Sequence, residues 1–318
     1  MRKFGKYLLF VFIPLIIVVG VNIWVDSRGI INESHIDSFV NDLSKSDIAI
    51  YENIPERMIA KKRIEMNQGK HFSKVVIGSS RILFLGKPID TKVFNVAVSG
   101  GGLEDCISLY ELLIKNSITF DTVVFSADPW VLNINHEDDR YEIFSENYFW
   151  SAFHELFSFK YFMDNVQLKD YKVWSGDEND FVRFTDGTIK YDKEYMDSDV
   201  NVIDYVNKET IYQLGNFETF DADYKNKALG FFKDVSKNHI VELFLLPYHP
   251  GIYKKLIERV PLVEETEKSF YNTKGENLNV IGSYNPDKYM LTDSNFYDAM
   301  HITEKGLKRI YDSRFNDN

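Results

Sequence analysis

The sequence predicts a three-layer α/β domain in which helices enclose a mostly parallel sheet of five strands. Two observations predict this fold class. The first is a series of short runs, apolar on both faces as central strands of a parallel sheet are, at residues 74–77, 93–98, 122–125, 241–246 and 278–281. The second is helical periodicity between and after these runs, at residues 102–116, 207–217, 222–237, 260–271 and 304–311. Strands that alternate with helices imply right-handed crossovers within one sheet.

Composition supports a folded protein and excludes several function classes. The 318 residues are 44% hydrophobic and 15% aromatic, which suffices for a sizeable core. The 37 basic and 48 acidic residues give a formal charge of -11, which argues against nucleic-acid binding because that needs a basic face. Cys106 is the single cysteine, so it closes no internal disulfide and excludes thiolate zinc motifs. The sequence implies no metal and no organic cofactor.

The N-terminus predicts a signal anchor in the plasma membrane. Residues 7–25 carry no charge, and about 20 apolar residues in a helix match the thickness of a bilayer. Arg2, Lys3 and Lys6 precede this run, so the positive-inside rule places residues 1–6 in the cytoplasm and the rest outside. Two alternatives remain. A cleaved signal peptide has a shorter apolar region and a small-residue cleavage site, and a buried core helix keeps a polar stripe.

Two segments interrupt the strand and helix rhythm. Residues 26–70 are expected to form a stalk with two packing helices, one at 35–43 and one that starts around Asn53, has Pro55 in its first turn and runs to residue 64. Residues 71–318 form the α/β domain, with an aromatic-rich insertion at about 136–220 expected to act as a lid. Within this insertion, residues 181–191 predict a hairpin with Asp-Gly at its turn.

Residues that carry chemistry follow the predicted strands. In open α/β sheets the ligand lies beyond the carboxyl ends of the strands. A hydroxyl on a strand-to-helix turn, a glycine turn, and an Asp with a His three residues later supply a nucleophile, oxyanion donors, an orienting group and a base. The catalytic candidates are Ser80, Asp298 and His301, with the N–H groups of Ser80 and Gly100 facing the oxyanion. The residues expected to line the site or bind substrate are Ser79, Arg81, Asp128, Trp130 and His249.

These same motifs resemble those of the SGNH (GDSL-type) hydrolases. Gly78-Ser79-Ser80 is similar to the family's Gly-Asp-Ser block, with Ser80 as nucleophile and Ser79 in place of the aspartate. The segment 95–100 resembles the second block, whose glycine N–H helps bind the oxyanion, and Asp298-x-x-His301 matches the terminal block. The resemblance spans about residues 73–313 except the insertion, and it implies a flavodoxin-like sheet and a serine esterase or acyltransferase.

One departure and one subgroup qualify the resemblance. The family's third block places an Asn after the third strand as an oxyanion donor, where this chain has Asp128. An ionised carboxylate would repel a developing oxyanion. The Gly-Ser-Ser form behind a membrane anchor is similar to proteins that acylate envelope polymers, such as the D-alanine transfer protein of teichoic acids and the alginate O-acetylation proteins. That similarity implies a cell-surface carbohydrate polymer as substrate and a membrane-bound O-acyltransferase as partner.

Structural interpretations stand beside these functional ones. Ser79 and Ser80 also suit a helix cap, and Asp298 with His301 also suits a helix N-terminal box. His249 also suits a loop contact and Arg81 a surface salt bridge, while Trp130 and the aromatic residues of the insertion also suit a small core. The sequence therefore predicts an outward-facing serine esterase or O-acyltransferase acting on acyl esters, acetyl above all, of cell-surface polysaccharide. The alternative is a scaffold of the same fold that has lost catalysis and binds glycan or an acyltransferase.

Overall fold

The computed structural model describes most of the chain. The described residues are 2–51, 54–86, 92–136, 139–145, 147–166, 171–192, 195, 204, 206–208, 214 and 217–313, with side chains from residue 12 onward. The helix predicted at 207–217 falls almost wholly outside this set.

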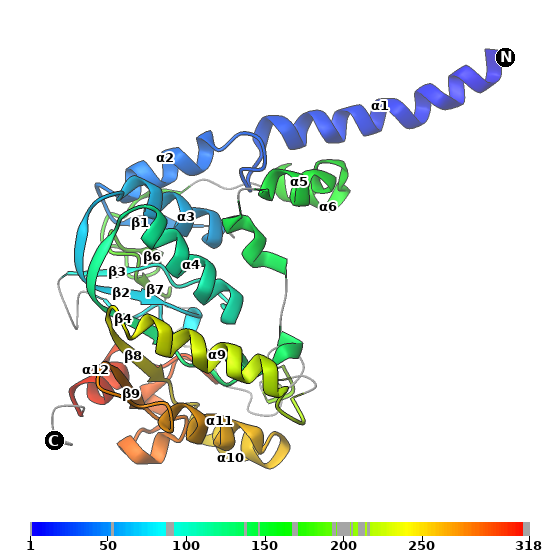
Figure 1. Ribbon diagram of the computed structural model, residues 1–318. Coiled ribbons are helices and arrows are strands. Elements are labelled where there is room, and N and C mark those ends of the chain that lie inside the picture. The colour runs from blue at the N-terminus through cyan, green and yellow to red at the C-terminus, as the bar shows by residue number, and fades with distance from the viewer. Residues whose placement is uncertain are drawn as a thin grey trace.

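A parallel five-stranded sheet forms the centre of the molecule and confirms the predicted fold class (Figure 1). Its order is β3-β2-β4-β8-β9, and every neighbouring pair is parallel. This is the doubly wound order 2-1-3-4-5, in which the chain reverses direction across the sheet between β2 and β4. The strands are β2 (His71–Ile77), β3 (Val93–Asn95), β4 (Thr119–Ser126), β8 (Ile240–Leu245) and β9 (Leu278–Gly282).

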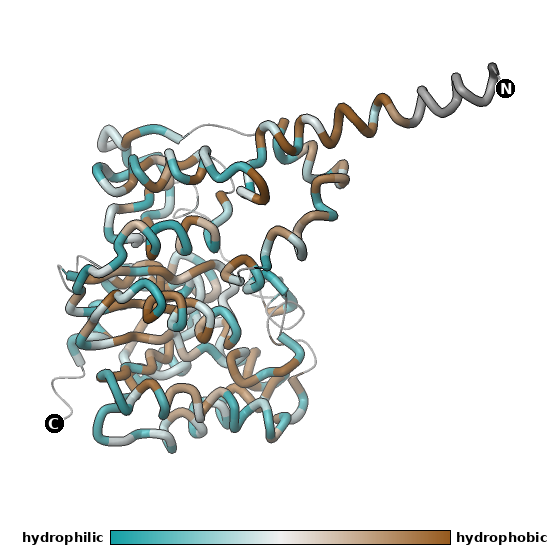
Figure 2. Tube along the Cα trace, turned by 45° about the horizontal axis from the view of Figure 1, so that its top comes forward, coloured by the Kyte–Doolittle hydropathy of each residue, from teal (hydrophilic) through white to brown (hydrophobic). Residues whose placement is uncertain are grey.

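Helices cover both faces of this sheet because successive side chains of each strand point to opposite faces. Val75 and Val123 belong to one core, and Val76 and Val124 to a second core on the other face. Against the first core pack α4 (Leu103–Lys115), α9 (Ala222–Val235), α10 (Pro250–Arg259) and α11 (Leu262–Tyr271), and against the second packs α12 (Glu304–Ser313). Figure 2 shows the hydrophobic strands enclosed between these layers.

Four of these helices were predicted and α10 was not. His249 and Pro250 supply its start, since His249 caps the helix by accepting from the Gly251 N–H and Pro250 occupies the first turn. The helix ends at Arg259, and α11 begins after Pro261. The aromatic and aliphatic side chains of α10 join the same core as α11. The sequence pattern alone assigns Pro250 to the turn that follows the strand, because proline is as common in turns as at helix starts, and it therefore does not predict the helix.

A second, antiparallel sheet joins the expected stalk to the expected insertion. Its order is β5-β1-β6-β7, so the stalk strand lies between strands of the insertion. The hairpin predicted at 181–191 is confirmed, with Gly187 in its turn. The stalk is therefore built into the folded body of the protein. The strands are β1 (Ile48–Ile50), β5 (Lys172–Val173), β6 (Phe181–Arg183) and β7 (Ile189–Lys190).

The remaining helices are short except for the first. The two predicted stalk helices are confirmed as α2 (Ser34–Leu43) and α3 (Glu56–Met66); Pro55 immediately precedes α3 and does not lie in its first turn, and Asn53 lies outside the described residues. The others are α1 (Arg2–Val25), α5 (Tyr148–Ala152) and α6 (Phe159–Val166). The 3₁₀ turns are η1 (Ser80–Ile82), η2 (Pro129–Leu132), η3 (Ile134–His136), η4 (Asp139–Phe144), η5 (Phe153–Phe157), η6 (Pro286–Tyr289) and η7 (Asp293–Asn295).

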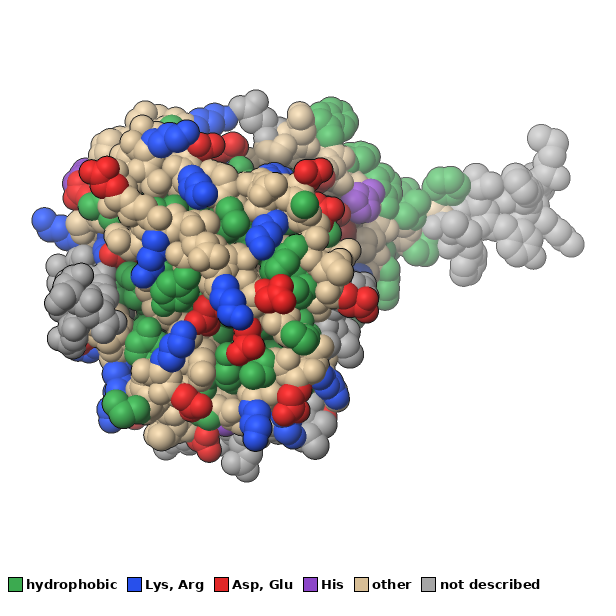
Figure 3. Space-filling view, turned by 60° about the horizontal axis from the view of Figure 1, so that its bottom comes forward, with side chains coloured by type: hydrophobic (Ala, Val, Ile, Leu, Met, Phe, Trp, Pro, Cys, Tyr) green, Lys and Arg blue, Asp and Glu red, His purple; other side chains and the backbone are tan. Residues whose placement is uncertain are grey.

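Helix α1 projects from the rounded body (Figure 1). Among the described residues, no helix combines the length and the apolar character that a membrane crossing requires. On the face of the body shown in Figure 3, cationic and anionic side chains are interspersed, with no field of a single sign.

Candidate active site

Ser80 follows β2 on a tight turn that positions its hydroxyl. Gly78 has a φ of +148°, and a Cβ there would lie 2.5 Å from the Cβ of Ser126, so this position requires glycine. Ser79 caps η1 by accepting from the Arg81 N–H at 3.2 Å, as the capping interpretation expects. Ser80 is the first residue of η1 and is partly exposed, whereas both of its neighbours are fully buried.

The structure brings Ser80, His301 and Asp298 together, although 221 positions separate Ser80 from His301. The Ser80 Oγ lies 3.0 Å from the His301 Nε2, and the His301 Nδ1 lies 2.7 Å from the Asp298 Oδ2. A carboxylate accepts only, so His301 donates from Nδ1 and offers Nε2 to accept the serine proton. This is the geometry of a nucleophile, a general base and an orienting carboxylate.

The Asp298 carboxylate serves both the imidazole and its own turn. Its Oδ1 accepts from the Met300 and His301 N–H groups, each at 2.8 Å, and its Oδ2 holds the imidazole. The spacing of three residues therefore suits both the helix-box and the catalytic interpretation. Burial opposes ionisation, but the imidazole of His301 and the other donors outweigh it and hold the pKa of Asp298 well below its usual range.

This pKa has a consequence for stability. Because it lies below that of an unfolded aspartic acid, about 3.9, ionised Asp298 stabilises the fold fully above that pH. The contribution is lost as the pH falls further, through the folded-state pKa.

Tyr195 is a site residue that the sequence analysis missed. Its hydroxyl donates to the Asp298 Oδ2 and lies 3.4 Å from the His301 Nδ1. Its ring packs on Tyr191 at 4.1 Å between centroids, and Tyr191 contacts the His301 ring edge-on at 5.7 Å. Both tyrosines lie in the insertion, at the end of its hairpin and just beyond it, so the insertion reaches the triad. No local pattern marks Tyr195 as a site residue, since its contacts with Asp298 and His301 lie more than 100 positions away.

We expect Tyr195→Phe to slow turnover of a small acetyl ester roughly tenfold, because a hydrogen bond to a charged group is worth about 1.5–3 kcal/mol. The same substitution should raise the Asp298 pKa, so the variant should unfold more easily than the parent at pH 7. Turnover, and the Asp298 pKa followed by carboxyl NMR shifts in parent and variant, measure the two effects. An unchanged Asp298 pKa in the variant would reduce Tyr195 to a packing residue.

Beneath the triad lies a fully buried ion pair. The Arg81 Nη1 donates to the Asp128 Oδ1 at 2.9 Å, and both side chains are inaccessible to solvent. The other carboxylate oxygen of Asp128 accepts from Ser79 at 2.7 Å and from Ser126. The Asp128 carboxylate therefore neutralises a buried guanidinium and accepts from two hydroxyls, which accounts for an acid at this position.

Arg81 connects this pair to the rest of the site. Its Nη2 donates to the carbonyls of Leu246 and Pro247 at 2.6 and 2.8 Å, and its Nε donates to the carbonyl of Met300 at 3.2 Å. Met300 directly precedes His301. The guanidinium thus joins the serine turn, the end of β8 and the histidine loop, and its burial makes it a positioning group beneath the site.

His249 and Trp130 also act through neighbouring loops. His249 Nδ1 caps α10, its Nε2 lies 3.3 Å from Asp293, and its backbone N–H donates to the Ala299 carbonyl at 3.0 Å. Burial lowers the pKa of His249, although the nearby carboxylates oppose this. Trp130 is buried and donates from its indole to the Gly101 carbonyl at 2.9 Å. Both residues therefore hold loops that carry site residues.

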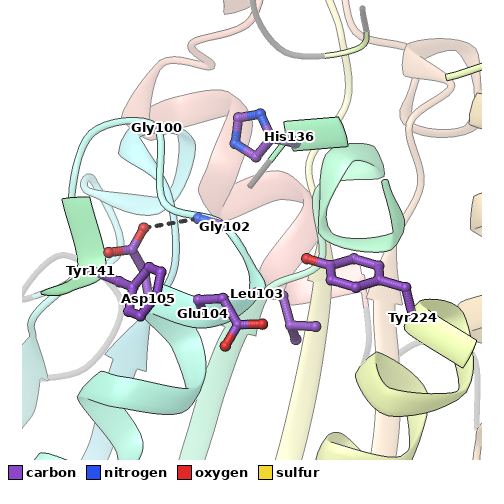
Figure 4. A pocket seen from close by; sticks show the side chains of 8 residues that line it. All are labelled: Gly100, Gly102, Leu103, Glu104, Asp105, His136, Tyr141 and Tyr224. Carbon is purple, nitrogen blue, oxygen red and sulfur yellow. Dashed lines mark hydrogen bonds between the residues drawn. The ribbon is translucent and has the colours of Figure 1, made fainter. Parts of the chain in front are cut away.

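The Gly100 turn stands beside a cavity of about 10 Å³, which has room for a single water (Figure 4). Gly100 has a φ of +62°, which favours glycine, and its carbonyl accepts from Arg140 at 3.3 Å. In Figure 4 the Asp105 carboxylate points at the Gly102 N–H, which donates to it at 3.1 Å. This cavity is too small for an acylated sugar.

A much larger groove of about 800 Å³ begins next to the same turn. Ser99 and Arg140 line it near Gly100, Tyr148 lines its wall, and Arg28 lines it at the base of α1. Phe181 lines the groove and lies 5.8 Å from the ring of Tyr191, which contacts His301. One aromatic ring therefore separates the groove wall from the catalytic candidate.

No protein-family model matches this sequence, and no curated protein matches it at a significant level. The resemblance to the SGNH hydrolases thus rests on the motifs themselves and does not assign the chain to a family.

Proposed function

We propose that the chain is an outward-facing, membrane-anchored serine esterase or O-acyltransferase. Its substrate class is acyl esters of cell-surface polysaccharide, with acetyl as the acyl group. The hydrogen-bonded series from Ser80 through His301 to Asp298 is the single observation that carries the proposal, because nucleophile, base and orienting group each lie within hydrogen-bond distance of the next.

The chemistry follows from these positions. Ser80 attacks the acyl carbonyl as its proton passes to the Nε2 of His301, and Asp298 stabilises the imidazolium that forms. The N–H groups of Ser80 and Gly100 face the oxyanion in this proposal. His301 then protonates the leaving alcohol, which leaves an acyl group on Ser80. Water releases it in an esterase, and a sugar hydroxyl accepts it in a transferase.

The groove supports a carbohydrate as the substrate. Its volume lies within the range of ligand sites, and its walls combine aromatic rings, Tyr148 and Phe181, with charged groups of both signs. Arg28 pairs there with Asp164 at 3.0 Å, so the charges largely compensate one another. Such a surface offers many donors and acceptors to sugar hydroxyls without selecting for a strongly charged polymer.

The anchor is supported by the sequence of α1. Residues 7–25 are uncharged and basic residues precede them, as in a single-pass protein with a cytoplasmic N-terminus and an external domain. Residues 7–11 of this run lie before the described side chains. A membrane-bound O-acyltransferase is the partner proposed to supply the acyl group, on the basis of the motif resemblance.

A serine-directed organophosphonate tests the enzyme directly. We expect the full chain to form one covalent adduct, which mass spectrometry of peptides should map to Ser80, because His301 activates that hydroxyl alone. Ser79, which is buried, and Ser99, which is exposed, are internal controls and should stay unmodified. A chain that stays unlabelled and also turns over no ester would favour the catalytically inactive scaffold.

A further inference from the structure

An exposed apolar patch covers the segment of the insertion that packs on α1. Its rings pack on aromatic neighbours of the same segment: Trp150 meets Phe149 edge-on and Phe159 stacks on Phe162, with centroids 4.9 and 5.6 Å apart. Trp150 is 74% exposed and Phe159 is 65% exposed. Patches of this kind mark interaction sites. We define the aromatic patch as Trp150, Phe153, Phe157, Phe159, Met163 and Val166, which lie on α5, η5 and α6.

Buried polar contacts fix this patch to the base of α1. The Asn22 side chain donates to the carbonyls of Leu156 and Ser158 at 3.0 and 3.1 Å, and Asn165 donates to the Asn22 Oδ1 at 3.1 Å. The Tyr161 hydroxyl donates to Asp26 at 2.6 Å. Burial raises the pKa of Tyr161, which keeps this hydroxyl a neutral donor. The aromatic patch therefore has one set position relative to the helix axis.

We propose that the aromatic patch enters the interfacial region of the outer leaflet and docks the domain on the lipid surface. This inference rests on the proposed anchor. Trp24, 80% exposed, lies in the last turn of α1, close to the contacts that hold α6. Trp and Phe side chains favour the depth of the headgroups, so α1 and the segment fixed to its base both present aromatic side chains suited to that depth.

The charges near the patch favour a lipid surface of no particular charge. Lys160 and Asp164 lie on α6 among the patch residues, and His154 and Glu155 lie on η5. Both signs are present, so apolar insertion, not attraction to anionic headgroups, drives the contact. Hydrophobic side chains also gather where α1 leaves the body in Figure 3.

Docking would set the direction of the groove. Ala152 and Ser151 line the groove on the same segment that carries Trp150 and Phe153, and Arg28 lines it two residues beyond Asp26. A patch held in the headgroups therefore places the part of the groove lined by Ala152 and Arg28 near the membrane surface, while Ser99 lines the groove beside the Gly100 turn.

Single labels on the full chain test this proposal. The native Cys106 is buried, so a cysteine introduced at an exposed position takes a fluorophore selectively. Phe159→Cys and Trp150→Cys report on the patch. Ile240→Cys is the matched control, an exposed apolar residue at the start of β8, and Ile16→Cys reports on α1. Each labelled chain is reconstituted in phosphatidylcholine vesicles with a nitroxide quencher on the headgroup or within the acyl chain.

We expect headgroup nitroxide to remove most of the emission at positions 159 and 150 and none at 240, and acyl-chain nitroxide to quench position 16. Quenching at position 16 with full emission at positions 159 and 150 would overturn the proposal that the patch docks on lipid. The proposal that α1 anchors the enzyme would still hold. Full emission at all positions would instead refute the anchor. If the emission at position 159 changed with the number of protein copies per vesicle but not with the nitroxide, the patch would contact a second copy of the chain, and the proposal would also be overturned.

Discussion

Ser80→Ala and His301→Ala are each expected to slow turnover of a small acetyl ester at least about a thousandfold, with no further loss in the double variant. The reason is that the two side chains act as one unit. Without the serine there is no acyl-enzyme, and without the imidazole 3.0 Å away nothing accepts the serine proton. The measurement is kcat/KM of the parent, both single variants and the double variant.

Ser34→Ala is the matched control, because Ser34 is an exposed serine at the start of α2 and lies outside both the triad and the groove lining. It should keep nearly the parental rate. Losses that multiply in the double variant would mean that Ser80 and His301 act separately, and a parental rate in Ser80→Ala would remove the nucleophile from the proposal.

Asp128→Asn should lower the free energy of unfolding by about 3–5 kcal/mol, because it leaves the buried Arg81 guanidinium without a counter-charge. Turnover should fall as well, since Arg81 also holds the Met300 carbonyl next to His301. Denaturant unfolding of the parent, Asp128→Asn, Arg81→Met and the double variant measures the coupling. The double variant should lose less free energy of unfolding than the two single variants lose in sum, because replacing both residues leaves no unpaired charge in the core.

Asp312→Asn provides the comparison at the surface. Asp312 pairs with Lys308 at 2.7 Å, but both side chains are more than half exposed, so its loss should cost less than about 1 kcal/mol. If Asp128→Asn left stability unchanged while activity disappeared, the carboxylate would have a part in the chemistry itself and not in positioning.

The central sheet could be predicted from the sequence because its strands are marked locally. A strand buried on both faces has a short, mainly apolar sequence, and each of the five runs ends in small or turn residues. Parallel strands align their carboxyl ends on one edge, so the residues after them converge. This convergence predicted Ser80 at that edge, and the spacing of Asp298 and His301, which follow no predicted strand, supplied the orienting group and the base.

Other features have no local signal. The strand in residues 48–50 is only three residues long, and its partners in the insertion lie more than 120 positions away, so the small sheet was not foreseen. Tyr195 is one of 19 tyrosines in the chain, and only the path of the insertion brings it to Asp298.

The sequence by itself determined the fold class, the positions of the strands and the candidates Ser80, Asp298 and His301, since periodicity, strand ends and residue spacing are local properties of the chain. Only the tertiary structure decided what the buried polar groups do. From the sequence, Asp128 occupies the position of an oxyanion donor, where a carboxylate is unsuitable. In the structure its carboxylate instead pairs with Arg81 and accepts from Ser79 and Ser126. The physical reason is that a charge removed from water must find partners in space, and those partners come from whichever segments the fold brings near.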